Sequence, residues 1–198
     1  MGTPKAALEW HGGTLLHRTV SVLAAATGGP VVVVRAAGQP LPRLPDATMV
    51  VEDPRAGRGP LQGIAAGLAA LAALDSPEAA FAAATDMPFL HLAFVRRVLA
   101  ALAEDQADVA LPVARGHAQP LAAAYRVALA PVADQLVASG RLRPADLFAL
   151  CAVTELDETR LLVDAALAAA DPGLDSLINV NHPGEYAAAL ARSQRDQK

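Results

Sequence analysis

The feature that most constrains the fold is a run of four consecutive valines at residues 31–34, directly after Gly28-Gly29-Pro30. A continuous β-branched run is typical of a strand buried on both faces, because a strand with one face in water alternates apolar and polar residues. Strands of this kind belong to parallel sheets that helices cover on both sides. The run therefore predicts an α/β protein with a parallel sheet.

Helical and strand-like patterns alternate along the rest of the chain. Helices are predicted at residues 14–26, 61–74, 93–102, 127–138, 144–150 and 161–169 and from Pro183 onward, with Thr14 as an N-cap and Pro60 opening the second helix. Strands are predicted at 31–34, 49–51, 81–84, 109–112, 121–125, 152–156 and 177–181. Gly116 lies between the fourth and fifth strands, so these two can form a hairpin. Strands alternating with helices indicate a three-layer α/β domain.

The composition limits the classes of function. The 198 residues fit one domain, which we place at 1–192 with a polar tail at 193–198. A hydrophobic fraction of 54% excludes a disordered chain, and the longest apolar run, residues 64–74, is too short to span a membrane. A net charge of -4 gives no electrostatic footprint for nucleic acid or an anionic membrane. With one cysteine and no secretory signal, we expect a cytoplasmic protein that acts on small molecules.

Two acidic residues directly follow predicted strands. Asp53 comes after MVVE and Asp86 lies in TDMPFL. Ligands bind at the carboxyl ends of strands in open α/β sheets, and a carboxylate there can hold Mg²⁺ together with substrate phosphates. A helix cap or Asx-turn is the alternative, favoured for either residue taken singly because a proline follows closely. Glu52 is expected to be a solvated neighbour, since adjacent strand residues face opposite sides.

A glycine-rich loop, GRGPLQG at residues 57–63, leads into the second predicted helix. The free backbone N–H groups of such a helix start suit an anion or the edge of a nucleobase. The loop is neither a Walker loop nor a GxGxxG fingerprint, and a tight connection is an equally good interpretation.

Lysine and asparagine are scarce, so each instance is informative. The lysines are Lys5 and Lys198, and the asparagines are Asn179 and Asn181. Lys5 precedes the first helix, where its ammonium can act as a point charge for a phosphate, or can simply be a surface lysine. Asn179 and Asn181 share one face of an extended segment and can both reach a ligand, although Asn181 is also a good cap for the last helix.

Taken in order, MGTPKAAL, GTLLHRTV, VVVV, VEDP with GRGPLQGI, ATDMPFL, PLAAAY and NVNHPGEY resemble the molybdenum cofactor guanylyltransferase (MobA-like nucleotidyltransferase) family. The resemblance runs from residue 1 to about residue 190, and GPLQGI, TDMPFL and NVN are its most specific parts. It implies a mostly parallel, Rossmann-like sheet of the nucleotidyltransferase type. It also implies transfer of GMP from GTP to the terminal phosphate of molybdopterin, with Mg²⁺ and release of pyrophosphate.

The resemblance assigns roles to the candidate residues. Lys5 would contact the nucleotide phosphates, Asp53 the nucleotide, and Asp86 both the nucleotide and Mg²⁺. Asn179 and Asn181 would lie where the two substrates meet. The remaining nucleotide-binding candidates are the loop residues Gly59, Pro60, Leu61 and Gly63, whose backbone groups can pair with a guanine edge. Molybdoenzymes or other cofactor-biosynthesis proteins are the expected protein partners.

A doubly wound sheet normally starts with a central strand that leads into a glycine-rich turn, whereas this sequence starts at the turn. The family itself begins with a strand and a Leu-Ala-Gly-Gly…Arg-Met-Gly loop, of which Met1-Gly2 remains here. We therefore expect the native protein to start about 10 to 20 residues earlier. Without that strand, a central row of backbone hydrogen-bonding groups would be unpaired.

Two alternatives to guanylyl transfer remain at this point. One is a related nucleotidyltransferase that uses CTP or another phosphorylated acceptor. The other, from a different class, is a non-catalytic nucleotide- or cofactor-binding protein.

Overall fold

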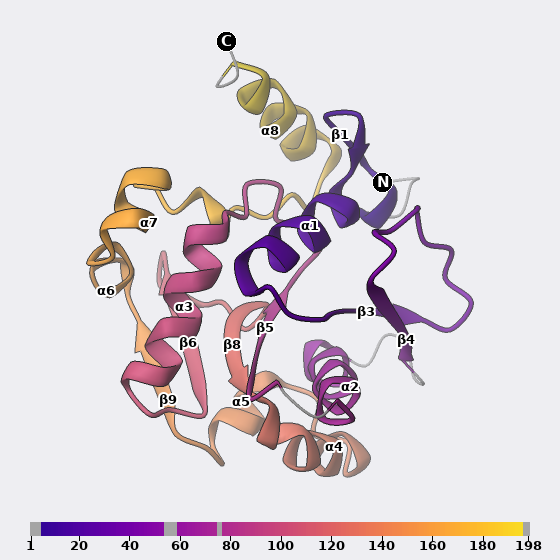
Figure 1. Cartoon of the computed structure of the whole chain (residues 1–198), viewed down its shortest axis with the longest axis vertical. Helices are drawn as coiled ribbons and strands as arrows, with labels where there is room; N and C mark the ends of the chain where they lie inside the picture. The colour runs from indigo at the N-terminus through magenta and orange to yellow at the C-terminus, as the bar shows by residue number, and fades with distance from the viewer. Residues whose placement is uncertain (1–4, 54–58, 75–76, 196–198) are drawn as a thin grey trace.

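The computed structural model describes residues 5–53, 59–74 and 77–195 (Figure 1). The sequence interpretations that concern Gly57 and Met1-Gly2 lie outside these ranges. The first long helix, α1 (Leu15–Thr27), has the predicted cap, because Thr14 Oγ1 accepts a hydrogen bond of 3.2 Å from the His17 amide. Gly28 ends it in the left-handed conformation (φ 64°), a backbone shape that favours glycine.

The valine run forms β3 (Val31–Ala36), which pairs in parallel with β4 (Thr48–Asp53). Val31 and Val33 point to one face and are each 8% exposed, in a cluster with apolar residues of α1. A short hairpin of β1 (Glu9–Trp10) and β2 (Gly13–Thr14) precedes α1. The run therefore forms the predicted strand, paired in the predicted direction.

A second, five-stranded sheet is mixed. Its strands are β5 (Ala79–Ala83), β8 (Ala122–Arg126), β6 (Val109–Ala114), β7 (His117–Ala118) and β9 (Val153–Leu156), with β8 between β5 and β6, and β9 on β6. Only the β6–β9 pair is parallel here, so the expectation of a mostly parallel sheet is corrected for this part of the molecule. The reason is local: the chain returns from β6 through a short turn and β7, and so close a return gives antiparallel pairing, as the predicted hairpin required.

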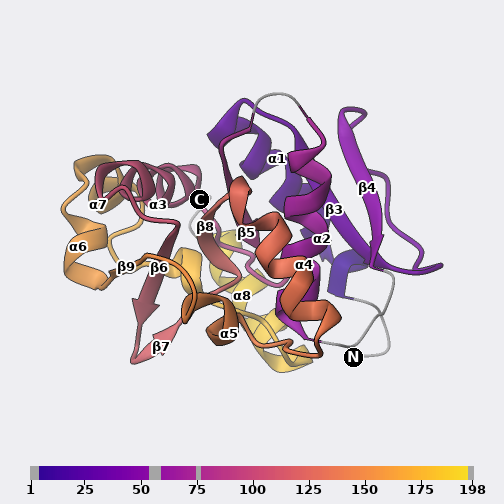
Figure 2. The same cartoon turned by 90° about the horizontal axis from the view of Figure 1, so that it is seen from below.

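Helices cover both faces of the five-stranded sheet (Figures 1 and 2). One face carries α3 (Leu92–Glu104), α6 (Glu158–Leu162) and α7 (Ala165–Ala170), and the other carries α2 (Pro60–Ala72), α4 (Ala130–Ala138) and α5 (Pro144–Phe148). Successive residues of a strand belong to the apolar cores on opposite faces of the sheet. Val109 packs with α2 and α4, while Ala110 packs with α3. The three-layer α/β prediction is confirmed.

Three boundaries differ from the sequence interpretation. The helix predicted at 161–169 is two short helices, because Asp157 and Asp164 each accept a hydrogen bond from the first turn of their own helix. The strand predicted at 177–181 is wrong: a 3₁₀ turn, η3 (Asp175–Leu177), runs into an extended segment held by one backbone bond from Val180. The last helix, α8 (Pro183–Arg195), continues into the predicted polar tail.

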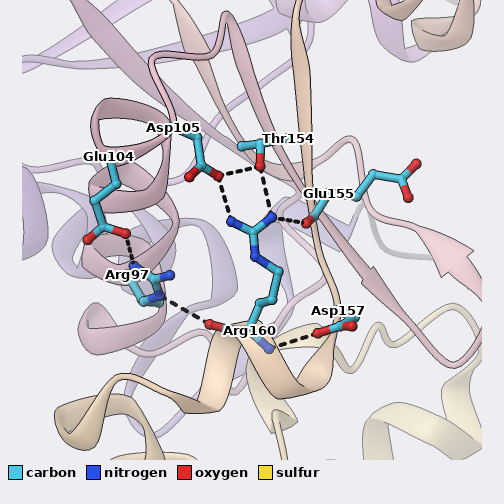
Figure 3. A network of polar contacts seen from close by, with 7 residues as sticks. All are labelled: Arg97, Glu104, Asp105, Thr154, Glu155, Asp157 and Arg160. Carbon is cyan, nitrogen blue, oxygen red and sulfur yellow. Dashed lines mark hydrogen bonds and ion pairs between the residues drawn. The ribbon is translucent and has the colours of Figure 1, made fainter.

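A network of hydrogen bonds and ion pairs connects the carboxyl end of α3 with β9 and α6. The Arg160 guanidinium donates to Asp105 Oδ2 (2.6 Å), to Thr154 Oγ1 (3.0 Å) and to the Glu155 carbonyl (2.7 Å). The Thr154 hydroxyl donates to the same Asp105 oxygen at 2.5 Å. These hydrogen bonds, from Thr154 first and Arg160 next, lower the pKa of Asp105. Figure 3 shows the network, which comprises Arg97, Glu104, Asp105, Thr154, Glu155, Asp157 and Arg160.

The longest helices have 13 residues, and no helix in the described ranges combines the length and apolarity needed to span a bilayer.

Candidate active site

Three of the predicted site residues meet in one hydrogen-bonded group. Lys5 Nζ lies 2.7 Å from Asp86 Oδ2 and 2.7 Å from Asn181 Oδ1. Lys5 opens the 3₁₀ turn η1 (Lys5–Ala7), Asp86 lies in the turn after β5, and Asn181 precedes α8. The fold therefore brings together an ammonium, a carboxylate and an amide that are separated by 81 and 176 positions along the chain.

The backbone around Asp86 is fixed by bonds to both neighbouring segments. The Asp86 carbonyl accepts a hydrogen bond of 2.9 Å from the amide of Val180, which places Asn181 beside it. On the other side, Arg18 of α1 donates to the carbonyls of Pro88 (2.7 Å) and Leu90 (3.3 Å). Burial lowers the pKa of the Arg18 guanidinium. The carboxylate of Asp86 is thus presented by a turn held from α1 and from the segment before α8.

The start of α8 decides between the two interpretations of Asn181. The Glu185 carboxylate accepts hydrogen bonds from the amides of Asn181 (2.6 Å) and His182 (3.1 Å), and these bonds lower the pKa of Glu185. Glu185 therefore caps the helix, and the Asn181 side chain is turned to Lys5 instead. Asn179 is exposed and has no hydrogen-bond partner among the described residues, so the structure joins only one of the two asparagines to the group.

Asp53 belongs to a second group at the end of β4. Its Oδ1 accepts a hydrogen bond from Nε2 of Gln62, which lies in the first turns of α2. Gln62 is 3% exposed, and its Oε1 is buried without a partner in the described part of the chain. Gln62 is not among the residues predicted from the sequence, although it is the one polar side chain between Pro60 and the end of α2. Glu52 is exposed and paired with Arg35 at 2.8 Å, as a solvated neighbour would be.

The glycine-rich loop ends in a helix start that has no side-chain cap. Gly59 is the N-cap of α2 with φ 91°, and an added Cβ would meet the Leu142 carbonyl at 3.2 Å, so glycine is required there. Gly59 and Pro60 are exposed, and Gly63 is half-buried. Leu61 differs, because its side chain is fully buried in the core. Among these candidates, Leu61 can offer a nucleotide only its backbone.

A hollow lies beside the Lys5 group. It has a volume of about 240 Å³ and is bounded by Lys5, by Val33, Val34 and Gln39 from the end of β3, and by Thr85 from the end of β5. Asp53 is the last residue of β4, and Asp86 follows the end of β5. The groups around these two residues thus lie at the carboxyl ends of the strands, the edge at which α/β sheets bind ligands.

The residues present fit a magnesium ion that is bound jointly by the protein and by the phosphates of a substrate. Mg²⁺ is usually held by one or two carboxylates and completed by waters and substrate phosphates. Asp86 supplies one such carboxylate, 17% exposed, whose Oδ1 has no hydrogen-bond partner in the described ranges while Oδ2 is taken by Lys5. Within the same ranges, no cluster of three or more His, Cys, Asp or Glu residues forms a complete protein cage.

The match to an NTP transferase family model gives the class of protein, a nucleotidyltransferase, and the carboxylate, ammonium and amide at the carboxyl edge of the strands fit that class. Residues 1–150 match the family model described as the MobA-like NTP transferase domain, and the chain belongs to that family.

Relatives of known name agree with this assignment. A probable molybdenum cofactor guanylyltransferase of Mycobacterium tuberculosis is 39% identical over 142 residues, which cover 71% of this chain and 68% of the relative. A protein of the same name from Mycobacterium avium is 38% identical and covers 71% of this chain and 70% of the relative. The chain is thus an enzyme of the nucleotidyltransferase class whose relatives serve molybdenum cofactor biosynthesis.

Solved structures share the fold. The molybdopterin-guanine dinucleotide biosynthesis protein A of Archaeoglobus fulgidus superposes with a TM-score of 0.73 at 18% identity, covering 98% of this chain and 92% of that one. The 2-C-methyl-D-erythritol 4-phosphate cytidylyltransferase of Thermus thermophilus gives 0.67 at 20% identity, with 96% and 94% covered.

Proposed function

We propose that the protein transfers GMP from GTP to the phosphate of molybdopterin, forming the guanine dinucleotide cofactor and releasing pyrophosphate. The observation that carries the proposal is the meeting of Lys5, Asp86 and Asn181 at the carboxyl edge of the sheets. The names of the relatives at 39% identity support guanylyl transfer in particular.

In the proposed reaction, an oxygen of the acceptor phosphate attacks the α-phosphorus of GTP. A new P–O bond forms, the bond between the α-phosphorus and the bridging oxygen breaks, and pyrophosphate leaves with that electron pair. The acceptor phosphate is already ionised near neutral pH, so the protein need not remove a proton. Catalysis is then mainly a matter of positioning and charge neutralisation.

Each residue of the site has a part in this scheme. The Lys5 ammonium, which contacts Asp86 and Asn181, would bind the phosphates of the nucleotide. Asp86 Oδ1 would hold Mg²⁺, which when bound neutralises phosphate charge and orients the triphosphate. Asn181, with Asn179 two residues away, would bind the acceptor. The backbone groups from Gly59 to Gly63 would pair with the donor edge of guanine, and Asp53, oriented by Gln62, would bind the nucleotide.

The test is nucleotide-dependent release of pyrophosphate by the full-length natural protein. The protein is incubated with Mg²⁺ and molybdopterin, and GTP, CTP and ATP are compared. We expect release with GTP, only when molybdopterin is present. Release with CTP instead would assign the chain to the cytidylyl-transferring relatives. Tight nucleotide binding with no release from any triphosphate would make it a binding protein, and either result would overturn the proposal.

A further inference from the structure

Asp86 lies in a segment that has no helix or strand of its own. Residues 84–91 join β5 to α3 and contain turns only. Pro88 and Leu90 of this segment are buried, so the backbone groups around them need hydrogen-bond partners within the protein. The direction in which the Asp86 carboxylate points therefore depends on contacts from other elements.

Arg18 of α1 binds two carbonyls of this segment. Its Nε donates to the Pro88 carbonyl at 2.7 Å, and its Nη2 donates to the Leu90 carbonyl at 3.3 Å. A planar guanidinium can bind two acceptors at once because its N–H groups point in fixed directions, whereas a lysine ammonium acts as a single point. Phe89, between the two carbonyls, packs its ring edge-on against Trp10, with 5.7 Å between the ring centroids. The segment is therefore held by α1 through its backbone and by β1 through a side chain.

Other contacts already join α1 to α3. The two helices pack through apolar residues, since Leu23 of α1 contacts the cluster to which α3 belongs (Figure 1). Arg96 of α3 donates to two carbonyls of α1, those of Ala25 at 2.9 Å and Ala26 at 3.2 Å. Arg18, by contrast, is half-buried and forms no ion pair within the described residues. What Arg18 adds is a connection from α1 to the segment that follows β5.

This connection also bears on the other residues of the site. The Asp86 carbonyl accepts a hydrogen bond of 2.9 Å from the amide of Val180, which is 1% exposed and directly precedes Asn181. Arg18 binds the segment two and four residues after Asp86. A shift of the segment would therefore disturb the bond to Val180 and move both Asp86 and Asn181 relative to Lys5, whose Nζ lies 2.7 Å from each.

We propose that Arg18 is a positioning residue, which holds the Asp86 carboxylate in the orientation that binds a divalent cation. It acts through the backbone carbonyls of Pro88 and Leu90 rather than on the metal or the substrate itself. The inference rests on the proposed function for the identity of the cation, Mg²⁺ bound together with the phosphates of GTP. A turn that is already restricted loses less conformational freedom when the ion binds. Loss of the guanidinium should therefore weaken Mg²⁺ binding although Asp86 itself is unchanged.

The first test is independent of enzymatic activity and measures the exchange rate of the Val180 amide by NMR. Arg18→Gln removes the charge and the two-pronged contact, and Arg96→Gln, the matched control, removes the other guanidinium that binds two carbonyls. A general loss of stability would also raise exchange in β6, so the β6 amides are the reference. We expect Val180 exchange to rise about tenfold relative to β6 in Arg18→Gln and to stay within about twofold in Arg96→Gln. An unchanged rate in Arg18→Gln, or an equal rise in both variants, would overturn the proposal.

Arg18→Lys keeps the proposal testable if Arg18→Gln does not fold. Lysine retains the charge but can bind one carbonyl at a time, so Val180 exchange should lie between that of the wild type and that of a side chain without the contact. Full wild-type protection in Arg18→Lys would show that the charge is sufficient, which contradicts positioning through both carbonyls.

The second test measures how pyrophosphate release from GTP depends on Mg²⁺ in the full-length natural protein. We expect the half-saturating Mg²⁺ concentration to rise about fivefold or more in Arg18→Gln, while the KM for GTP at saturating Mg²⁺ stays within about twofold. Arg96→Gln should match the wild type in both. A lower kcat with an unchanged Mg²⁺ requirement would overturn the positioning role. Absence of release from the wild type would contradict the proposed function alone, because Val180 exchange tests Arg18 without any turnover.

Discussion

At the level of single residues, Lys5 and Asp86 form an ion pair whose value for stability is small. Their side chains are 36% and 17% exposed, and pairs open to solvent contribute about 0–1 kcal/mol. A pair that adds little to folding, joined to Asn181 at the carboxyl edge of the strands, is better explained by the proposed site than by the fold.

The first prediction concerns Asp86→Asn. Asparagine keeps the size of the side chain, so we expect the thermal midpoint to change by the equivalent of about 1 kcal/mol or less. Pyrophosphate release should fall ~10²- to 10³-fold, because the anionic oxygen proposed to bind Mg²⁺ is lost. The measurement is a Mg²⁺ titration of activity in the full-length natural protein, alongside thermal unfolding.

The matched control is Glu52→Gln, which removes an exposed carboxylate from β4 near the same edge. Its activity should stay within about twofold of wild type, since its contact is an exposed ion pair with Arg35. Retention of full activity by Asp86→Asn would show that Asp86 has only a structural part.

Gln62 gives the second prediction, because it donates a hydrogen bond to Asp53 while its buried Oε1 has no partner among the described residues. Gln62→Met removes both features at similar volume, so their losses partly offset and stability should stay within about 1 kcal/mol of wild type. Gln62→Glu instead places a second carboxylate against Asp53 and should cost about 1–3 kcal/mol. Urea unfolding of the two variants distinguishes them, and a greater loss in Gln62→Met would contradict the explanation.

Lys5, Asp86 and Asn181 could be selected from the sequence because of rarity or position after a strand, which are local properties. Their mutual contact could not, since it depends on how turns 81 and 176 residues apart are packed. Gln62 was missed for a related reason. A single glutamine in an apolar helix pattern is indistinguishable from a solvent-facing residue until the burial of α2 is known.

At the level of elements, the network of Arg160, Asp105 and Thr154 makes the α3–β9–α6 junction sensitive to acid (Figure 3). The folded-state pKa of Asp105 is lowered, so its contribution to stability is complete above the ordinary aspartate pKa of about 3.9. It is lost as the pH falls through the lower folded value. Protonation removes the charge that the Arg160 guanidinium binds.

The third prediction follows from the lowered pKa of Asp105. Asp105→Asn should lower the thermal midpoint at pH 7, and the gap to wild type should close as the pH falls below about 4, because a protonated aspartate resembles asparagine. Asp134→Asn, at an exposed position of α4, is the control and should follow wild type at every pH. A gap of constant size across the titration would assign the effect to packing.

Local chemistry also explains which elements could be predicted. Thr14 and Gly28 bracket α1 through contacts within a few residues, so sequence was sufficient there. The alanines after Leu161 give no signal for where one helix ends and another begins, and the break is defined by the hydrogen bond that the Leu167 amide donates to Asp164 Oδ1. The segment at 177–181 has strand-like residues but forms no strand ladder within the described residues, where the Val180 amide bonds to the Asp86 carbonyl instead.

At the level of the whole molecule, the five-stranded sheet and the β3–β4 sheet differ in how completely their side chains are buried. Val109, Ala110, Ala124 and Tyr125 on the paired strands β6 and β8 are completely buried. In the other sheet β4 lies at an edge, and Val50 is 43% exposed. The valine run predicted a parallel sheet, and this holds only for its own pairing with β4, because the pairing of β8 depends on the turn after β6.

The fourth prediction is a ranking of amide hydrogen exchange in the chain of residues 1–198. The slowest amides should lie in β6 and β8, and those of β3 and β4 should exchange faster, since exchange follows local enclosure and contact density. Uniform protection of the two sheets would contradict this ranking and show that they open as one cooperative unit.

The contacts of Lys5 with Asp86 and Asn181 also determine when the site can form during protein synthesis. Asn181 is made 176 residues after Lys5, an interval of about 9–35 s at ribosomal rates of about 5–20 residues per second. During that interval the nascent chain contains Lys5, and later Asp86, but does not yet contain Asn181, the third member of the hydrogen-bonded group. The site is therefore among the last features of the molecule to form, after both sheets have been translated.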